Sequence, residues 1–165
     1  MIKTTPDIIP NTTVELGPNW HPADRFSGDE MIDAYFLGRK AGIEAGWDEK
    51  FQILVKQFKT NIESAVSVSE TLYKQASEIG IALKTIHLRS DGLSKFTALF
   101  VVDAKDFISD NFLNVYKISR KLNGNKSNPD IYISFLFTPA SDTLNQDCLT
   151  ADGYFLNYAK DQGTV

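Results

Sequence analysis

Few residues in this sequence could carry chemistry, and they lie far apart along the chain. His87 and Arg89 are two positions apart in an alternating segment, so they share one face of a predicted strand. On an open face, an imidazole beside a guanidinium would bind an anion. We therefore take His87 and Arg89 as the candidate ligand-binding residues of a small-ligand-binding or enzymatic protein, although such pairs more often lie on a solvated sheet face.

The other reactive side chains have structural explanations. Asp103 and Asp106 precede an apolar-periodic segment, where their spacing is typical of an N-cap and a first helical turn rather than of paired catalytic carboxylates. Cys148 stands next to Asp147, in an environment unlike that of a reactive cysteine. Phosphate-binding glycine loops, H-E-x-x-H, G-x-S-x-G and C-x-x-C are all missing. The sequence therefore predicts no catalytic residue, no metal site and no cofactor.

The composition is that of an ordinary globular domain. The chain has 165 residues, 42% of them hydrophobic and 23% charged, which suits one domain and excludes a disordered protein. One cysteine and two histidines exclude a disulfide framework and argue against a Cys/His zinc site. No apolar run reaches the roughly 20 residues of a membrane span, and the N-terminus lacks a signal-peptide pattern. We expect a soluble, cytoplasmic protein with no membrane contact.

Charge alternates along the chain. Residues 1–50 carry five basic and nine acidic side chains. Residues 51–126 carry eleven basic and seven acidic side chains, and residues 127–165 carry one basic and five acidic side chains. This acidic, basic, acidic order would let the ends of one copy lie against the middle of the same or another copy. A pI near 5.1 and the lack of a recognisable nucleic-acid module argue against a nucleic-acid partner.

Residues 1–26 hold four of the six prolines and show no helical or strand period, so they are predicted to form an extended arm. The arm contains several large apolar residues, with Trp20 as its expected anchor. Such an arm should dock on its own domain or on a neighbouring subunit, and the sequence does not choose between them.

A helix is predicted to begin at the capping box Ser27-Gly28-Asp29-Glu30. Ala34, Gly38, Gly42 and Gly46 follow at steps of four, which stacks small residues in one helical stripe and allows a second helix to approach closely. The stripe resembles the glycine-repeat helices of stalk proteins that regulate type III secretion and flagellar export ATPases. That resemblance implies a stalk-like regulator with one helix continuous through Gly46, followed by a small α/β domain.

From Asp48 to Ile79 the apolar residues recur at steps of four and three, interrupted only by the polar Ser69, and predict one long helix. The apolar stripe along this helix, here called its seam, is too long for one small domain to cover. We therefore expect part of the seam to meet another helix. Residues 27–80 are accordingly predicted to be a helical oligomerisation region. The expected helix-interface residues are Ala34, Gly38, Gly42, Gly46, Phe51, Val55, Phe58, Ile62 and Ala65.

Residues 81–165 predict an α+β sandwich packed with these helices. Two strands join at Asp91-Gly92, a helix runs from Asp103 to Leu122, and a third strand spans 130–138. Residues 140–153 read as a polar loop, and 154–159 fit either a short strand or a short helix. The expected fold is a two-layer sandwich with a mainly antiparallel sheet of three to four strands, a ferredoxin-like variant of order α-β-β-α-β.

The preferred functional hypothesis is a non-enzymatic assembly or adaptor protein. It would self-associate through its helices, as a homo-oligomer, and bind protein partners through the sandwich and the arm. The alternatives are a ligand-binding or enzymatic sandwich at His87 and Arg89, and the stalk-like regulator.

Overall fold

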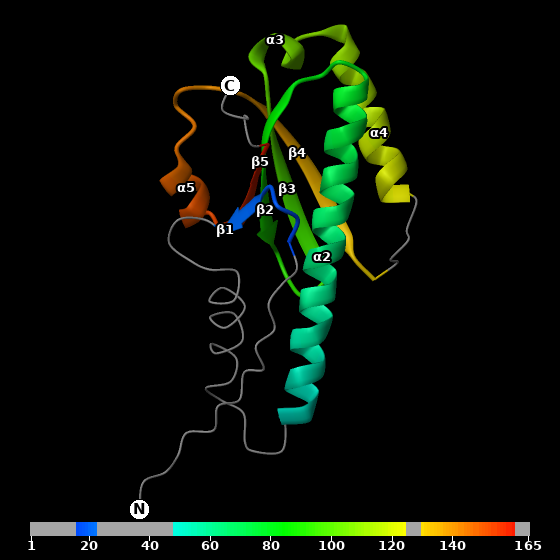
Figure 1. Cartoon of the computed structure of the whole chain (residues 1–165), viewed down its shortest axis with the longest axis vertical. Coiled ribbons are helices and arrows are strands. Elements are labelled where there is room, and N and C mark those ends of the chain that lie inside the picture. Colours follow the sequence, from blue (N-terminus) through cyan, green and yellow to red (C-terminus); the bar gives the residue numbers. More distant parts are fainter. Residues whose placement is uncertain (1–15, 23–47, 125–129, 161–165) are drawn as a thin grey trace, which may run out of the picture.

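The computed structural model describes residues 16–22, 48–124 and 130–160, and within them the chain is mixed α and β (Figure 1). One five-stranded sheet carries helices, which agrees with the predicted α+β class. The elements are β1 (Trp20–Pro22), α2 (Asp48–Glu78), β2 (Leu83–Ser90), β3 (Lys95–Val102), α3 (Ala104–Phe107), a 3-10 turn (Asp110–Phe112), α4 (Leu113–Gly124), β4 (Tyr132–Pro139), α5 (Gln146–Ala151) and β5 (Tyr154–Ala159).

The strand order is β1-β5-β2-β3-β4. The β1–β5, β5–β2 and β2–β3 pairs are antiparallel, whereas β3 and β4 are parallel neighbours. Since α4 connects β3 to β4, these elements form a simple βαβ unit with its two strands side by side. The ferredoxin-like unit expected from the sequence is a split βαβ, so the topology differs from that prediction. The sheet is also wider than the predicted three to four strands.

Helix α2 packs on this sheet along its heptad seam. Val55, Phe58 and Ile62 are buried together with Ile86 of β2 and Phe100 of β3. The seam continues through four fully buried residues, most of them small: Ala65, Ser69, Leu72 and Ala76.

The sheet of the same chain therefore covers these seam residues, and α4 contacts α2 as well. Pairing of the seam with a helix of a second copy stays a prediction. The strands turn every second residue toward α2, and Ile86, Leu88, Phe96 and Phe100 are buried on that face.

The first turns of α2 extend beyond the strands (Figure 1). A helix of 31 residues measures about 46 Å, whereas a strand of eight residues measures about 27 Å. Ile53 and Leu54, in the projecting part, are 63% and 41% exposed. Phe51 is half-buried. At its other end α2 ends at Glu78, shortly before Gly80, which adopts a φ of 82° that only glycine adopts readily.

The helix predicted from Asp103 to Leu122 is broken into three pieces. Asp103 caps α3 by accepting the Lys105 N–H at 3.0 Å. The chain then becomes extended at Ser109, whose φ and ψ are −79° and 147°, before the 3-10 turn and α4 begin. The break lets the chain turn at the end of β3 and send α4 back across the sheet, where Val115 joins the core.

Part of the N-terminal arm is a strand. β1 pairs with β5 in antiparallel register, with Trp20 opposite Tyr158. β5 itself lies between β1 and β2, so the segment 154–159, left open between strand and helix, is a strand inside the sheet. The predicted loop 140–153 contains α5, whose N-cap Asn145 accepts the Asp147 N–H.

Several sequence predictions lie outside the described residues. The helix beginning at Ser27 and the small-residue stripe Ala34, Gly38, Gly42 and Gly46 all fall between residues 23 and 47. The same holds for the continuity of a helix through Gly46, on which the stalk-like reading depends.

Within residues 16–22, 48–124 and 130–160, no helix has an apolar stretch of the length that a bilayer crossing requires.

Candidate functional site

The face of the sheet away from α2 and α4, here called the second face, carries the polar residues singled out from the sequence. Ile86 and Leu88 point into the core, so His87 and Arg89 point to the second face. The strand register places His87 opposite Asn157 of β5 and Leu99 of β3. One row across the five strands consists of His21, Asn157, His87, Leu99 and Leu136.

His87 is a buried imidazole on that face. Its side chain is only 4% exposed, its Nε2 lies 3.1 Å from the Thr85 hydroxyl, and its ring meets Tyr154 edge-on at 6.4 Å. Burial disfavours the charged ring and lowers the pKa of His87 to about 4. The imidazole is therefore neutral near pH 7 and adds no positive charge beside Arg89.

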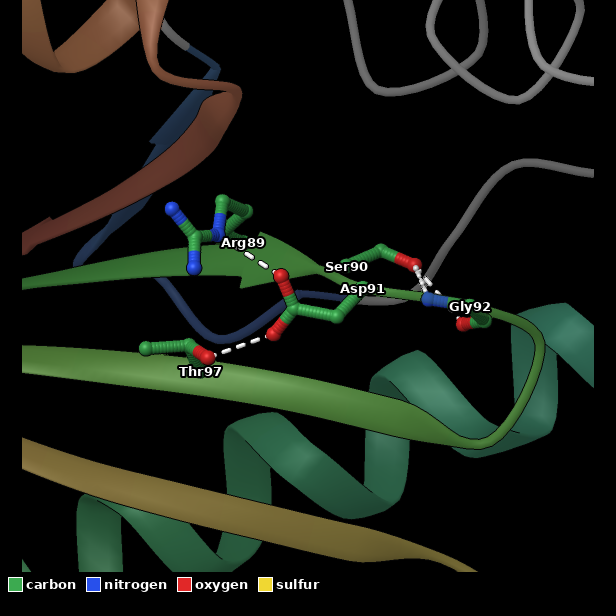
Figure 2. Close-up of polar contacts among 5 residues, drawn as sticks. All are labelled: Arg89, Ser90, Asp91, Gly92 and Thr97. Atoms are coloured by element: carbon green, nitrogen blue, oxygen red, sulfur yellow. Dashed lines mark hydrogen bonds and ion pairs between the residues drawn. The ribbon is translucent and has the colours of Figure 1, made fainter.

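Arg89 lies in a polar cluster with the hairpin turn and β3 (Figure 2). Its Nε donates to Asp91 Oδ1 at 2.8 Å, and the Thr97 hydroxyl donates to Asp91 Oδ2. Within the same turn the Ser90 hydroxyl donates to the Gly92 carbonyl oxygen at 2.8 Å. Asp91 therefore ties β2 and β3 together at the hairpin and neutralises the guanidinium.

Tyr154 of β5 covers the other side of this cluster. The Arg89 guanidinium carbon is 5.1 Å from the centre of the Tyr154 ring, a cation–π arrangement. Gly153 precedes the ring with a φ of 90°, which turns the chain from α5 into β5. Burial raises the pKa of Tyr154, with Asp91 and Asp152 adding to the rise and Arg89 opposing it. The phenol is neutral and serves as packing.

The polar and aromatic side chains of the second face therefore contact one another. Every buried side-chain nitrogen and oxygen among the described residues has a hydrogen-bond partner. The described residues contain no group of three metal-ligating side chains. His87 and Arg89 do lie together on one strand face, where His87 is a neutral ring and Arg89 Nε donates to Asp91.

The two aspartates of the β3–α3 junction also have structural partners. The carboxylate of Asp103 accepts the Lys105 N–H and lies 3.6 Å from Lys84 Nζ, and these contacts lower the pKa of Asp103. Asp106 Oδ2 accepts the Ala82 N–H at 2.6 Å. Both carboxylates therefore stabilise the turn that follows β3.

Trp20 is held on this chain's own sheet. Its Nε1 donates to Glu70 Oε1 of α2 at 2.8 Å, and its ring meets Tyr158 of β5 edge-on at 5.4 Å. The side chain is buried. The arm segment around Trp20 therefore covers the edge of β5, which would otherwise end the sheet.

The opposite edge of the sheet, formed by β4, is open among the described residues, where no strand pairs with its outer side. The Tyr132 N–H donates to the Ser94 carbonyl and the Ala140 N–H to the Val102 carbonyl, so even-numbered residues bond toward β3. Successive residues direct their backbone groups to opposite sides, and the odd-numbered ones face outward. The N–H and C=O groups available to a partner are those of Ile133, Phe135 and Phe137.

This edge carries no charge and is flanked by exposed apolar side chains. Residues 131–140 contain no Asp, Glu, Lys or Arg, although charges on edge strands are a common protection against pairing. Tyr132 is 61% exposed and Leu136 is 45% exposed. Beside the strand, the exposed ring of Tyr116 of α4 meets Phe137 at 5.1 Å. The β4 edge is the strongest candidate interaction surface in the described part of the molecule.

Sequence reasoning missed Asp91, Thr97 and Tyr154 as members of the Arg89 cluster. Counting outward from the turn at Asp91-Gly92 along the two strands of the hairpin would have placed Thr97 opposite Arg89. Tyr154 had no local signal, because β5 reaches β2 only through long-range pairing. The β4 strand itself was predicted, but its position at the edge depends on the parallel crossover through α4.

Comparisons of the chain with protein-family models, with curated proteins and with solved structures found no match.

Proposed function

We propose that this chain is a non-enzymatic assembly or adaptor protein that binds a protein segment by strand addition at the β4 edge. The observation that carries the proposal is an eight-residue edge strand without a single charged side chain. Main-chain hydrogen bonds from such an edge supply affinity, and the alternating side chains supply selectivity.

The two edges of the sheet support this proposal by their contrast. The β5 edge is covered by β1, which is anchored through the hydrogen bond from Trp20 to Glu70. The β4 edge has neither a covering strand among the described residues nor a protecting charge. We therefore place the interaction surface on β4 rather than on the α2 seam.

A labelled peptide with the sequence of residues 130–140 is a suitable probe, because it is an uncharged strand apart from Asp130. Fluorescence anisotropy should show saturable binding to the full chain. Leu136→Lys should weaken that binding about tenfold or more, since it puts a charge on the exposed face of the edge strand. The Leu136 backbone bonds toward β3, so the side chain alone is changed.

Two matched variants serve as controls for this experiment. Leu136→Thr keeps an uncharged strand former at the same position and should bind the peptide as the parent chain does. Ile53→Lys places the same charge on an exposed site of α2 and should also leave binding unchanged. Absence of saturable peptide binding to the parent chain, or equal binding by Leu136→Lys, would refute the β4 edge as the binding surface.

A further inference from the structure

We infer that the partner strand is the β4 strand of a second copy, paired antiparallel about a two-fold axis at Phe135. The inference rests on the proposed function, because it names the partner of the same edge. A two-fold dimer of this kind would join two five-stranded sheets into one continuous sheet.

The outward backbone groups of β4 fit a two-fold arrangement. With Phe135 opposite its own copy, Ile133 of each chain lies opposite Phe137 of the other. All three residues direct N–H and C=O outward, so each opposed pair exchanges two hydrogen bonds, as in an antiparallel ladder. Pro139 has no N–H and ends the ladder just beyond these pairs. The residues whose backbone N–H and C=O groups point outward therefore fix the register between the two β4 strands.

The side chains on the second face also suit this register. Ser134 lies opposite Leu136 of the other copy, and Tyr132 lies opposite Thr138. None of these side chains is charged, so no like charges oppose one another across the new pair.

Charges at the two ends of β4 favour the antiparallel orientation. The end at which β3 and β4 finish is acidic, and α3 contacts β4 there. On β2 and on the segments that follow β3 and β4, the charged residues at this end are Asp103, Asp106, Asp110, Asp142, Lys84 and Lys105. The end at which β3 and β4 begin, where α4 also ends, is basic, with Arg89, Lys95, Arg120, Lys121, Asp91 and Asp130.

A two-fold axis through Phe135 sets the acidic end of each copy beside the basic end of the other. The net charges at these ends are −2 and +2 from the residues just named, so both junctions are attractive. A parallel arrangement would place like ends together. Charge complementarity therefore selects a second copy in the antiparallel sense.

Sedimentation equilibrium on the full chain tests the dimer directly. We expect a reversible monomer–dimer equilibrium, weakened about tenfold or more by Leu136→Lys, because the two introduced lysines are diagonal neighbours across the axis. Leu136→Thr and Ile53→Lys should dimerise as the parent does. Circular dichroism of each variant establishes that a loss of dimer is not a loss of fold.

Cysteine pairing tests the register. In a Cys148→Ser background, which removes the exposed native thiol, Ser134→Cys and Leu136→Cys are prepared as separate variants. Directly opposed residues of neighbouring strands have Cβ atoms about 4.5–5.5 Å apart, close to the separation that a disulfide needs. An oxidised equimolar mixture should give a disulfide-linked heterodimer, whereas Ser134→Cys alone should give none.

The outcomes separate this inference from the proposed function. A chain that stays monomeric at all concentrations while its β4 edge still binds the 130–140 peptide overturns self-pairing and leaves the protein-binding proposal standing. A dimer that persists in Leu136→Lys, or a disulfide formed by Ser134→Cys alone, also overturns the inferred pairing. A monomer that binds no peptide overturns both.

Discussion

At the scale of single residues, His87 couples the stability of the fold to pH. Its pKa is lowered by burial from 6.5 to about 4, so the unfolded chain takes up a proton at a higher pH than the folded chain. The His87 contribution to stability is therefore fully present above about pH 7 and is lost as the pH falls from 6.5 toward 4.

Replacing this imidazole should flatten the acid side of the stability profile. We expect His87→Gln to reduce the difference in unfolding free energy between pH 7 and pH 4.5 by about 2 kcal/mol. Urea unfolding at the two pH values measures it, and the difference is informative even if the variant is less stable at both. His21→Gln changes an exposed histidine on β1 and is the matched control. An unchanged difference in His87→Gln would show that folding does not lower the pKa of this ring.

The sequence predicted that His87 and Arg89 share one strand face. It did not predict that His87 is buried or that Arg89 is paired with Asp91. Alternation alone placed both residues on one strand face. Whether that face was solvated depended on Tyr154, which is 67 residues beyond His87 in the sequence and reaches it through β5. The charge and the burial of these side chains therefore depend on tertiary contacts, which no local sequence pattern indicates.

At the scale of elements, the polar interruption of the α2 seam sets how closely the helix approaches the sheet. Ser69 is fully buried, and its hydroxyl donates to the Ala65 carbonyl at 2.8 Å. It needs no partner from the sheet and takes little space.

We expect Ser69→Leu to destabilise the fold by about 1–3 kcal/mol, because the added side chain overpacks this contact. Ser69→Ala should change stability by less than about 1 kcal/mol, since it is nearly isosteric with the native residue. Thermal or urea unfolding distinguishes the two. A stabilising Ser69→Leu would mean that α2 stands further from the sheet than the burial of this seam indicates.

The β1 strand depends on one side chain. Trp20→Ala removes the ring that meets Tyr158 and the donor to Glu70, and we expect a loss of about 3–5 kcal/mol. Trp20→Phe keeps most of the packing but not the hydrogen bond and should cost about 1–1.5 kcal/mol.

Hydrogen exchange shows whether β1 has detached in Trp20→Ala. The Ala159 N–H donates to the Asn19 carbonyl at 3.2 Å, so this amide should exchange faster in the variant. Amides of β3, an interior strand, should remain protected. Slow exchange of Ala159 in Trp20→Ala would show that backbone pairing alone holds β1 in place.

At the scale of the whole molecule, the strand order decides which surfaces are open. The periodicities predicted α2, the hairpin of β2 and β3, and β4 close to their observed bounds, because each pattern is local. The same patterns gave no means of ordering β5 between β1 and β2, or of making β3 and β4 parallel neighbours. Those pairings depend on contacts between distant segments, and they create the open β4 edge.

The strand order also has a consequence for synthesis. Asn19 and Tyr158, whose side chains are hydrogen-bonded, are 139 residues apart in the chain. Trp20 is translated well before β5, the strand against which its ring packs. β1 therefore cannot join the sheet until Tyr158 has been made, and until then the Trp20 ring lacks its partner on β5.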